Sequence, residues 1–327
     1  MLTVCLGVQL NKSLIISTAV VQVQFQSIFI NTRCAYRRYR GLVTSWRQSC
    51  LFTLHMMCGN FIMKRFVRSA LPSVYGVGIT SLNLGDAVEE ILELSQAGTP
   101  SSVFTLNLDH VVKLRRDPKF RLAYSHANVV TADGWPVAWV ARRQNAPVER
   151  TTGADLVLPL IDRAAESGVP VFLLGSTANV LGRAGREFVR RSEGRVNIAG
   201  SLAPSKTFDA EGVEAEAAIE QIRKSGAKIC FVALGAPKQE LFSELARKKG
   251  LCCCMVCIGA ALDFIAGEQV RAPQVLRDRG LEWAWRLAGN PRRLARRYFD
   301  SAVMFAYLAM SEMFKPKVNV DMRLPPN

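Results

Sequence analysis

Short apolar runs alternate with amphipathic segments from Val74 onward, and this alternation restricts the possible folds more than any other feature of the chain. Such runs are typical of buried strands, and apolar residues at helical spacing are typical of helices packed on a core. Strands are expected at 74–79, 102–108, 128–133, 169–176, 195–202, 228–235 and 253–260, and helices at 85–97, 109–124, 153–167, 178–192, 209–225 and 238–249. Near-continuous apolar strands indicate a parallel sheet covered on both faces. The expected fold class is α/β, with a mostly parallel, Rossmann-like sheet, helices on both faces and a C-terminal arginine-rich helical appendage.

Polar residues stand where several of these strands end. Because the carboxyl ends of parallel strands lie at one edge of a sheet, and ligands of open α/β sheets bind there, one pocket is expected to collect them. They are Thr105 and Asn107, Asp133 and Gly134, Gly175, Ser176 and Thr177, and Gly235, Lys238 and Gln239. The order strand-Gly-Ser-Thr-helix suits a phosphate bound by backbone amides at a helix N-terminus. It is also typical of a turn whose serine or threonine merely caps the next helix.

Asp133 is the best candidate for proton chemistry. It follows an apolar strand and precedes Gly134, so apolar neighbours at the rim of the sheet are expected to raise the pKa of its carboxyl group, which suits a general base. The alternative is a turn aspartate that hydrogen-bonds its own backbone. The local sequence favours neither interpretation.

Arginine is concentrated in residues 271–298, which contain eight arginines together with Trp283, Trp285 and Tyr298. Asn290-Pro291 predicts the start of a helix. The first two turns of that helix then hold Arg292, Arg293, Arg296 and Arg297. Because the helix dipole disfavours cations at this end, the arginines indicate an anionic partner such as a phosphate or diphosphate. The alternative is a solvated basic face.

The stretch that follows, residues 302–310, is nearly all apolar. Its nine residues are too few to span a bilayer, which takes about 20. A basic turn leading into an apolar helix is typical of a helix that lies at a membrane interface. Phe305 and Leu308 are expected to insert partly into the membrane there.

The formal net charge of +15 is unevenly distributed. No acidic residue precedes Asp86, and the nine Lys and Arg residues before it leave 33 basic and 27 acidic residues in the rest of the chain. Most of the remaining surplus lies in the arginine-rich end. An anionic membrane surface or a diphosphate is therefore expected as partner, and nucleic acid is not.

Residues 1–62 do not share the alternating pattern. Their apolar stretch is interrupted by Gln22, Gln24 and Gln26, which argues against a membrane-spanning helix. Their arginine-rich, acid-free composition resembles a transit peptide, but the favoured alternative is an over-long gene model with initiation near Met63. The expected organisation is an extension at 1–62, an α/β catalytic core at 63–270, a basic, membrane-associating helical appendage at 271–314 and a flexible tail at 315–327.

The nine cysteines form no framework of paired spacings, which indicates a reducing compartment. Cys254 and Cys257 form an isolated CxxC within an apolar run, and no second ligand pair accompanies it. Small apolar fillers are favoured over zinc ligands. No metal site and no cofactor are expected.

Six motifs, in this order, resemble the WecG/TagA/CpsF family of bacterial glycosyltransferases, also called glycosyltransferase family 26. They are TLNLDH, VVTADGWPVAW, ERTTGADLV, VALGAPKQE, IGAALDFIAGEQVRAP and LEWAWRLAGNPRRLARRY, and the resemblance covers roughly residues 74–300. It implies sugar transfer from a UDP-sugar donor to an acceptor sugar linked to polyprenyl diphosphate, with inversion and without a metal ion. It also implies a peripheral enzyme on the cytoplasmic face of the bacterial plasma membrane, and leaves a homo-oligomer open.

The resemblance implies roles for single residues. Asp133 becomes the catalytic base, Thr105 and Asn107 help to position the sugars, Gln239 borders the same pocket, and Arg286, Arg293 and Arg296 meet diphosphate charge. The absence of an Asp-x-Asp motif agrees with metal-free transfer, because arginines can then stabilise the departing UDP. Two places depart from many members: Trp135 replaces a small or aliphatic residue, and SLAPSKTFD replaces a more glycine-rich loop.

Two other classes of protein compete with this interpretation. A Rossmann-type sugar-nucleotide oxidoreductase or epimerase would require GxGxxG after its first strand, and VYGVGITSLNLGD does not supply it. A non-enzymatic, basic membrane-binding protein would leave the cluster around Asp133, Thr105 and Gln239 without a purpose.

Overall fold

The computed structural model describes residues 71–144, 146–289 and 291–314, and of Arg293 it describes the backbone alone. These residues belong to one compact unit, Arg68–Asn327. The expected extension at 1–62, the start near Met63, the tail at 315–327 and the capping role of Asn290 lie outside them. The boundary expected at residue 270 stays a prediction.

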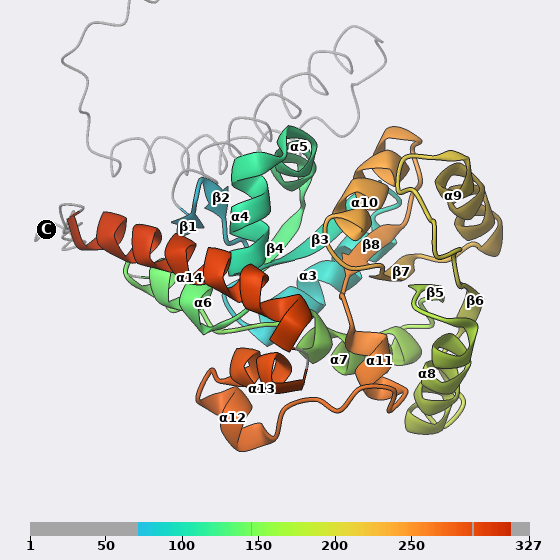
Figure 1. Cartoon of the computed structure of the whole chain (residues 1–327). Helices are drawn as coiled ribbons and strands as arrows, with labels where there is room; N and C mark the ends of the chain where they lie inside the picture. The colour runs from blue at the N-terminus through green and yellow to red at the C-terminus, as the bar shows by residue number, and fades with distance from the viewer. Residues whose placement is uncertain (1–70, 145, 290, 315–327) are drawn as a thin grey trace, which may run out of the picture. The chain divides into compact units, whose positions relative to one another are not determined.

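A six-stranded, all-parallel sheet forms the centre of this unit (Figure 1). Its order is β4-β3-β8-β7-β5-β6. The strands are β3 (Ser101–Leu106), β4 (Val129–Ala132), β5 (Val171–Gly175), β6 (Ile198–Leu202), β7 (Ile229–Ala233) and β8 (Cys254–Cys257). Six of the seven predicted strands are thus confirmed, and the parallel arrangement places their carboxyl ends at one edge.

The seventh predicted strand, 74–79, was wrong. It forms an antiparallel hairpin of β1 (Ser73–Val74) and β2 (Val77–Gly78), separate from the main sheet. Tyr75 and Gly76 have φ angles of +52° and +76°. Two successive residues in the left-handed region reverse the chain in a tight turn, so this segment cannot continue as one strand.

Helices cover both faces of the sheet, because alternate residues of each strand point to opposite sides. Cys254 and Val256 of β8 enter one apolar core, and Met255 and Cys257 enter the other. The first core is covered by α3 (Leu84–Gln96), α7 (Gly153–Glu166), α8 (Ala178–Arg191) and α11 (Ala261–Ile265). The second is covered by α4 (Leu108–Arg116), α5 (Pro118–His126), α6 (Trp135–Arg142), α9 (Val213–Ser225), α10 (Lys238–Lys248) and α14 (Pro291–Phe314).

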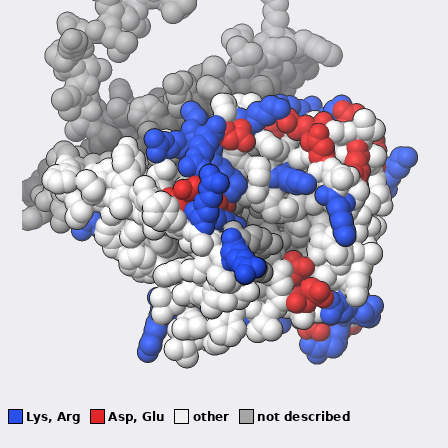
Figure 2. Space-filling view, in the orientation of Figure 1, with Lys and Arg blue, Asp and Glu red and all other residues white. Residues whose placement is uncertain are grey.

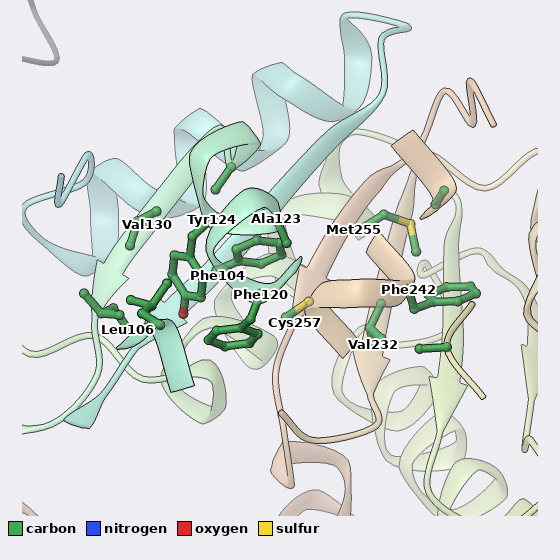
Figure 3. Packing of buried hydrophobic residues seen from close by; sticks show 14 of the residues in the cluster. Phe104, Leu106, Phe120, Ala123, Tyr124, Val130, Val232, Phe242, Met255 and Cys257 are labelled. Atoms are coloured by element: carbon green, nitrogen blue, oxygen red, sulfur yellow. The ribbon is translucent and has the colours of Figure 1, made fainter. Parts of the chain in front are cut away.

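Figure 3 shows the second core, where Cys257 lies among Phe120, Val232 and other apolar side chains. Cys254 and Cys257 are both buried and free. The interpretation of the CxxC residues as small core fillers is confirmed.

The helix predicted at 109–124 is two helices, α4 and α5. The break falls at Asp117-Pro118, because proline has no N–H to continue α4. Asp117 instead caps α5, and its Oδ1 accepts hydrogen bonds from the backbone N–H groups of Lys119 (2.9 Å) and Phe120 (3.2 Å). The local sequence contained this signal, since Asp-Pro is a typical helix start.

The arginine-rich end is helical, as predicted. It contains α12 (Gln274–Asp278), α13 (Glu282–Gly289) and α14, which starts at Pro291. Helix α14 lies along α4 and α6 (Figure 1). Among the helices that the structure describes, none is long and apolar enough to cross a bilayer.

Candidate active site

Asp133 lies directly after β4, at the carboxyl edge of the sheet. Its backbone N–H donates to the carbonyl of Leu106 (2.8 Å), and its Oδ2 accepts from Nδ2 of Asn107 (3.4 Å). The next residue, Gly134, has a φ of +97°, a conformation that L side chains rarely adopt. The turn therefore fixes the carboxylate beside the end of β3.

The pKa of Asp133 is raised to about 6, chiefly by burial and to a lesser extent by the nearby carboxylates of Glu282 and Asp155. The Arg286 guanidinium and the hydrogen bond from Asn107 lower it, although less than burial raises it. A carboxyl group with a pKa close to neutral can both accept and release a proton at physiological pH. The expectation of a raised pKa at Asp133 is confirmed.

Asn107 connects the catalytic candidate to a helix. Its Oδ1 accepts from the backbone N–H of His110 (3.0 Å), which caps α4, while its Nδ2 faces Asp133. Because both ends of the carboxamide are used, the side chain has one orientation. Thr105 lies two residues earlier, is buried and is paired in register with Thr131 of β4.

A charged network surrounds the start of α7 and reaches α13. Arg271 bonds Asp155 (2.7 Å), Arg150 approaches Glu282 (3.5 Å), and Arg286 bonds Glu282 (2.6 Å). Partial desolvation lowers the pKa of Arg286, but the charges of Glu282 and Asp133 and the hydrogen bond to Glu282 together outweigh it and raise the pKa. The network thus holds Arg286 within electrostatic reach of Asp133.

Gly175 and Ser176 stand at the end of β5. Gly175 has a φ of +113°, and a Cβ there would lie 2.4 Å from the carbonyl oxygen of Ala233. Ser176 donates through Oγ to Oδ1 of Asp263 (2.8 Å), and Thr177 caps α8. This turn therefore has a packing role and a capping role, as the simpler interpretation expected, and phosphate binding there stays a prediction.

The residues that follow β7 have partners within the protein. Gly235 has a φ of +72° and its carbonyl accepts from the backbone N–H of Gln239 (3.1 Å). The Lys238 ammonium donates to the carbonyl of Phe208 (2.8 Å). The Gln239 side chain is buried, and its Oε1 accepts from the backbone N–H of Gly259 (3.1 Å). The buried Gln239 side chain therefore supports the carboxyl edge of the sheet from the core side.

The first turns of α14 present arginines beside α4. Arg296 is exposed, and Arg297 pairs with Asp109 (3.1 Å). One helical turn further, Asp300 pairs with Arg116 of α4 (3.1 Å). Figure 2 shows Lys and Arg gathered where α4 meets the start of α14. The predicted role of the Arg293 side chain lies outside the described part of the chain.

The structure thus brings together Asp133, Asn107 and Arg286, and places Gly175, Ser176 and Gly235 at the ends of the neighbouring strands β5 and β7, on the same edge. Sequence reasoning did not single out Arg150, Asp263, Glu282 or the buried pair His110 and Glu240. Arg150 and Asp263 stand inside the motifs ERTTGADLV and IGAALDFIAGEQVRAP, which is the signal that could have found them. Among described residues, no group of three His, Cys, Asp or Glu side chains could hold a metal ion.

A protein-family model matches most of this chain. The model described as the Glycosyl transferase WecG/TagA/CpsF family matches residues 72–319, which is more than half of the chain. The match includes all the residues of the site described above.

Proposed function

This chain belongs to the WecG/TagA/CpsF family of glycosyl transferases, and on that premise we propose that it transfers a sugar from a UDP-sugar to a saccharide linked to polyprenyl diphosphate. The sugar is a hexose, an N-acetylhexosamine or its uronic acid, and the product serves the synthesis of cell-surface polysaccharide. The observation that supports this most is the Asp133 carboxyl group, held by Asn107 at the edge of the sheet with a pKa of about 6.

In the proposed step, Asp133 accepts the proton of an acceptor hydroxyl while that oxygen attacks the anomeric carbon of the donor. A new bond forms between the oxygen and the anomeric carbon, and the bond from this carbon to the β-phosphate oxygen breaks. The electron pair leaves with UDP, and the configuration is inverted. Asn107 orients the base, and general-base assistance of this kind contributes about 10² to 10⁴ in rate.

Negative charge develops on UDP as the bond breaks, and cations near the site can stabilise it. Arg286 lies close enough to Asp133 for each to shift the pKa of the other. We assign Arg286 to the leaving diphosphate, together with Arg293 and Arg296 at the start of α14. Transfer is proposed to need no metal ion or organic cofactor.

The outer face of α14 supports a location on a membrane. Exposed apolar residues recur along it at helical spacing, and they are Phe299, Val303, Tyr307, Met310 and Phe314. An apolar stripe that begins beside arginines suits the boundary between lipid headgroups and acyl chains. We propose that the protein binds the anionic inner face of the bacterial plasma membrane peripherally, where a lipid-linked acceptor is available.

The prediction that Phe305 and Leu308 insert into the membrane is wrong, because both lie on the face that packs inward. Leu308 is only 4% exposed, and the Phe305 ring lies 5.8 Å from the Trp135 ring and 5.7 Å from the Trp139 ring. Trp135, one of the departures from the family pattern, thus supports α14.

The competing dinucleotide enzyme has little support from the fold. Its phosphate-binding turn would join the first strand of the sheet to a helix through glycines. Here β3 leads into α4 through Asn107, and the glycine-containing segment at 74–79 is the hairpin of β1 and β2. The remaining alternative is a basic, membrane-binding protein without enzymatic activity, and an assay of sugar transfer distinguishes it from a transferase.

The test is Asp133→Asn, assayed with a panel of UDP-sugars and a short-chain polyprenyl-diphosphate saccharide. We expect turnover to fall by about 10² to 10⁴ while UDP binding stays close to wild type, because the substitution keeps the shape and removes the base. Wild-type turnover should also decline as pH falls below about 6, since the base is then protonated. Asp162→Asn, in a surface ion pair with Arg191, is the matched control. A variant at Asp133 that retains more than half of wild-type turnover would remove it from this role.

A further inference from the structure

A cluster of buried polar side chains lies close to the site but has no part in the proposed step. It consists of His110 from α4, Tyr124 from α5, and Gln239 and Glu240 from α10, none more than 4% exposed. His110 Nδ1 lies 2.7 Å from the Tyr124 hydroxyl, and Gln239 Nε2 donates to Glu240 Oε1 (2.8 Å). Figure 3 shows Tyr124 beside Phe104 and Phe120 in the core. A polar cluster in such surroundings requires an explanation, because unpaired buried polar groups are costly.

Glu240 is the unusual member. Its side chain is fully buried, and its Oε2 has no hydrogen-bond partner among the described residues. His110 Nδ1 is 3.9 Å from Oε1, too far for a hydrogen bond. Burial lowers the pKa of His110 to about 3, so the imidazole is neutral and cannot act as a counter-ion. An isolated carboxylate in this position would be expensive, so the geometry favours the protonated acid.

The hydrogen bond from Gln239 to Glu240 connects this acid to the edge of the sheet. The other end of the Gln239 carboxamide accepts from the backbone N–H of Gly259, two residues after the end of β8. The preceding residue, Ile258, touches the start of α7 so closely that a Cβ on Gly153 would lie 2.8 Å from its Cα. Helix α7 in turn carries Asp155, which belongs to the charged network that reaches Arg286.

We propose that Glu240 is a positioning residue whose uncharged carboxyl group holds the Gln239 carboxamide and, through it, the loop after β8 in the arrangement that sugar transfer requires. This inference rests on the proposed function. Ionisation of Glu240 would place a buried charge against the carboxamide and loosen the loop, so turnover should fall as Glu240 loses its proton.

The groups that face Glu240 determine the pH at which its carboxyl group ionises. The pKa of Glu240 is raised to about 7, chiefly by burial and slightly by the Asp109 charge. The hydrogen bond from Gln239, a hydrogen bond from the backbone of Glu240 itself and the Lys113 charge act in the opposite direction. Two further neighbours are Tyr124 and, from β8, Cys257; burial raises the pKa of each well above its usual value, and the Glu240 charge adds to the rise. Arg297 of α14 acts on the cluster through His110, whose pKa it helps to lower. None of these groups supplies a hydrogen-bonded counter-charge to Glu240 Oε2.

The experiment compares the pH dependence of kcat in the full-length wild type, Glu240→Gln and Glu244→Gln. Wild type should lose activity below about pH 6 through Asp133 and above about pH 7 through Glu240. Glu240→Gln keeps an uncharged group that accepts from Gln239, so it should retain the acid limb and lose the alkaline one. Glu244 lies one turn further along α10 and pairs with Arg247 (2.8 Å), so its variant should keep both limbs. An alkaline limb that is absent from wild type, or that persists in Glu240→Gln, would overturn the proposal.

Thermal unfolding tests the same inference without an assay of transfer. Because folding raises the pKa of Glu240 from 4.5 to about 7, its contribution to stability is fully present below pH 4.5 and is lost as pH rises towards 7. The Tm of wild type should therefore fall relative to that of Glu240→Gln across this window, and a constant difference would overturn the uncharged state. Absence of product at every pH would contradict the proposed function, whereas an active enzyme with unchanged limbs in Glu240→Gln contradicts only the role of Glu240.

Discussion

At the scale of single residues, the edge of the sheet depends on glycines at the ends of two neighbouring strands. Gly175 combines a φ of +113° with a carbonyl oxygen of β7 at 2.4 Å from where a Cβ would stand. Gly235, at the end of the neighbouring strand, has a φ of +72° but no atom within 4 Å of a Cβ. One glycine therefore fulfils a steric and a conformational requirement, and the other only the conformational one.

We expect Gly175→Ala to lower the free energy of unfolding by clearly more than Gly235→Ala. Backbone strain costs about 1–3 kcal/mol at either position, and overpacking adds about 1–3 kcal/mol at Gly175 alone. Denaturant unfolding of the two variants against wild type measures the difference. Equal losses would show that β5 and β7 can separate locally, and that the close approach at Gly175 does not constrain the turn.

Site residues could be predicted from the sequence where neighbouring residues in the chain indicated their position. Asp133 and Asn107 were found because each follows an apolar strand, and parallel strands end at one edge. The significance of Glu240 and His110 depends on each other and on Tyr124, in three different helices. No spacing in the sequence shows that a glutamate next to Lys238 and Gln239 turns into the core.

At the scale of elements, α14 has two apolar faces, one packed on the core and one exposed. Leu294, Met304 and Leu308 are buried, and two ion pairs join the helix to α4. The stripe from Phe299 to Phe314 faces outward. The sequence predicted an interfacial helix but assigned Phe305 and Leu308 to its outward face, because which face points outward depends on how the helix packs on α4 and α6. The inner face of α14 belongs to the core, so removing the helix would expose apolar surface and destabilise the protein. A loss of membrane binding in such a truncated protein could then not be distinguished from a loss of folding.

Surface substitutions avoid that problem. We expect Val303→Ser combined with Tyr307→Ser to weaken flotation with anionic vesicles by at least about tenfold, since each lost apolar side chain is worth about 1.5 kcal/mol or more when buried and about 1.4 kcal/mol is tenfold in affinity. The Tm should change little, because both side chains are more than half exposed. Val213→Ser, on exposed α9, is the matched control. Unchanged flotation of the double variant would exclude the outer stripe as the membrane-binding surface.

At the scale of the whole molecule, the candidate site residues that follow strands lie along one edge of one sheet. The strand order, with β3 and β4 on one side of β8 and β7, β5 and β6 on the other, separates the Asp133 group from the Ser176 group. Alternating apolar strands and helices were sufficient to predict this α/β fold, because burial on both faces leaves few other arrangements. The strand order was not predictable from the sequence, since it depends on packing between segments that are distant along the chain.

Transfer is expected to require only part of the chain. The family match covers residues 72–319, and every residue assigned to the proposed step lies within it. We therefore expect the protein without residues 1–62 to fold and to keep turnover close to that of the full chain, and to do so in EDTA, because arginines are proposed to stabilise the departing UDP. Initial rates of both proteins, with and without EDTA, and their Tm values measure this. A rate lost in EDTA and restored by magnesium or manganese would contradict metal-free transfer, whereas a truncated protein that fails to fold would give the extension a structural role.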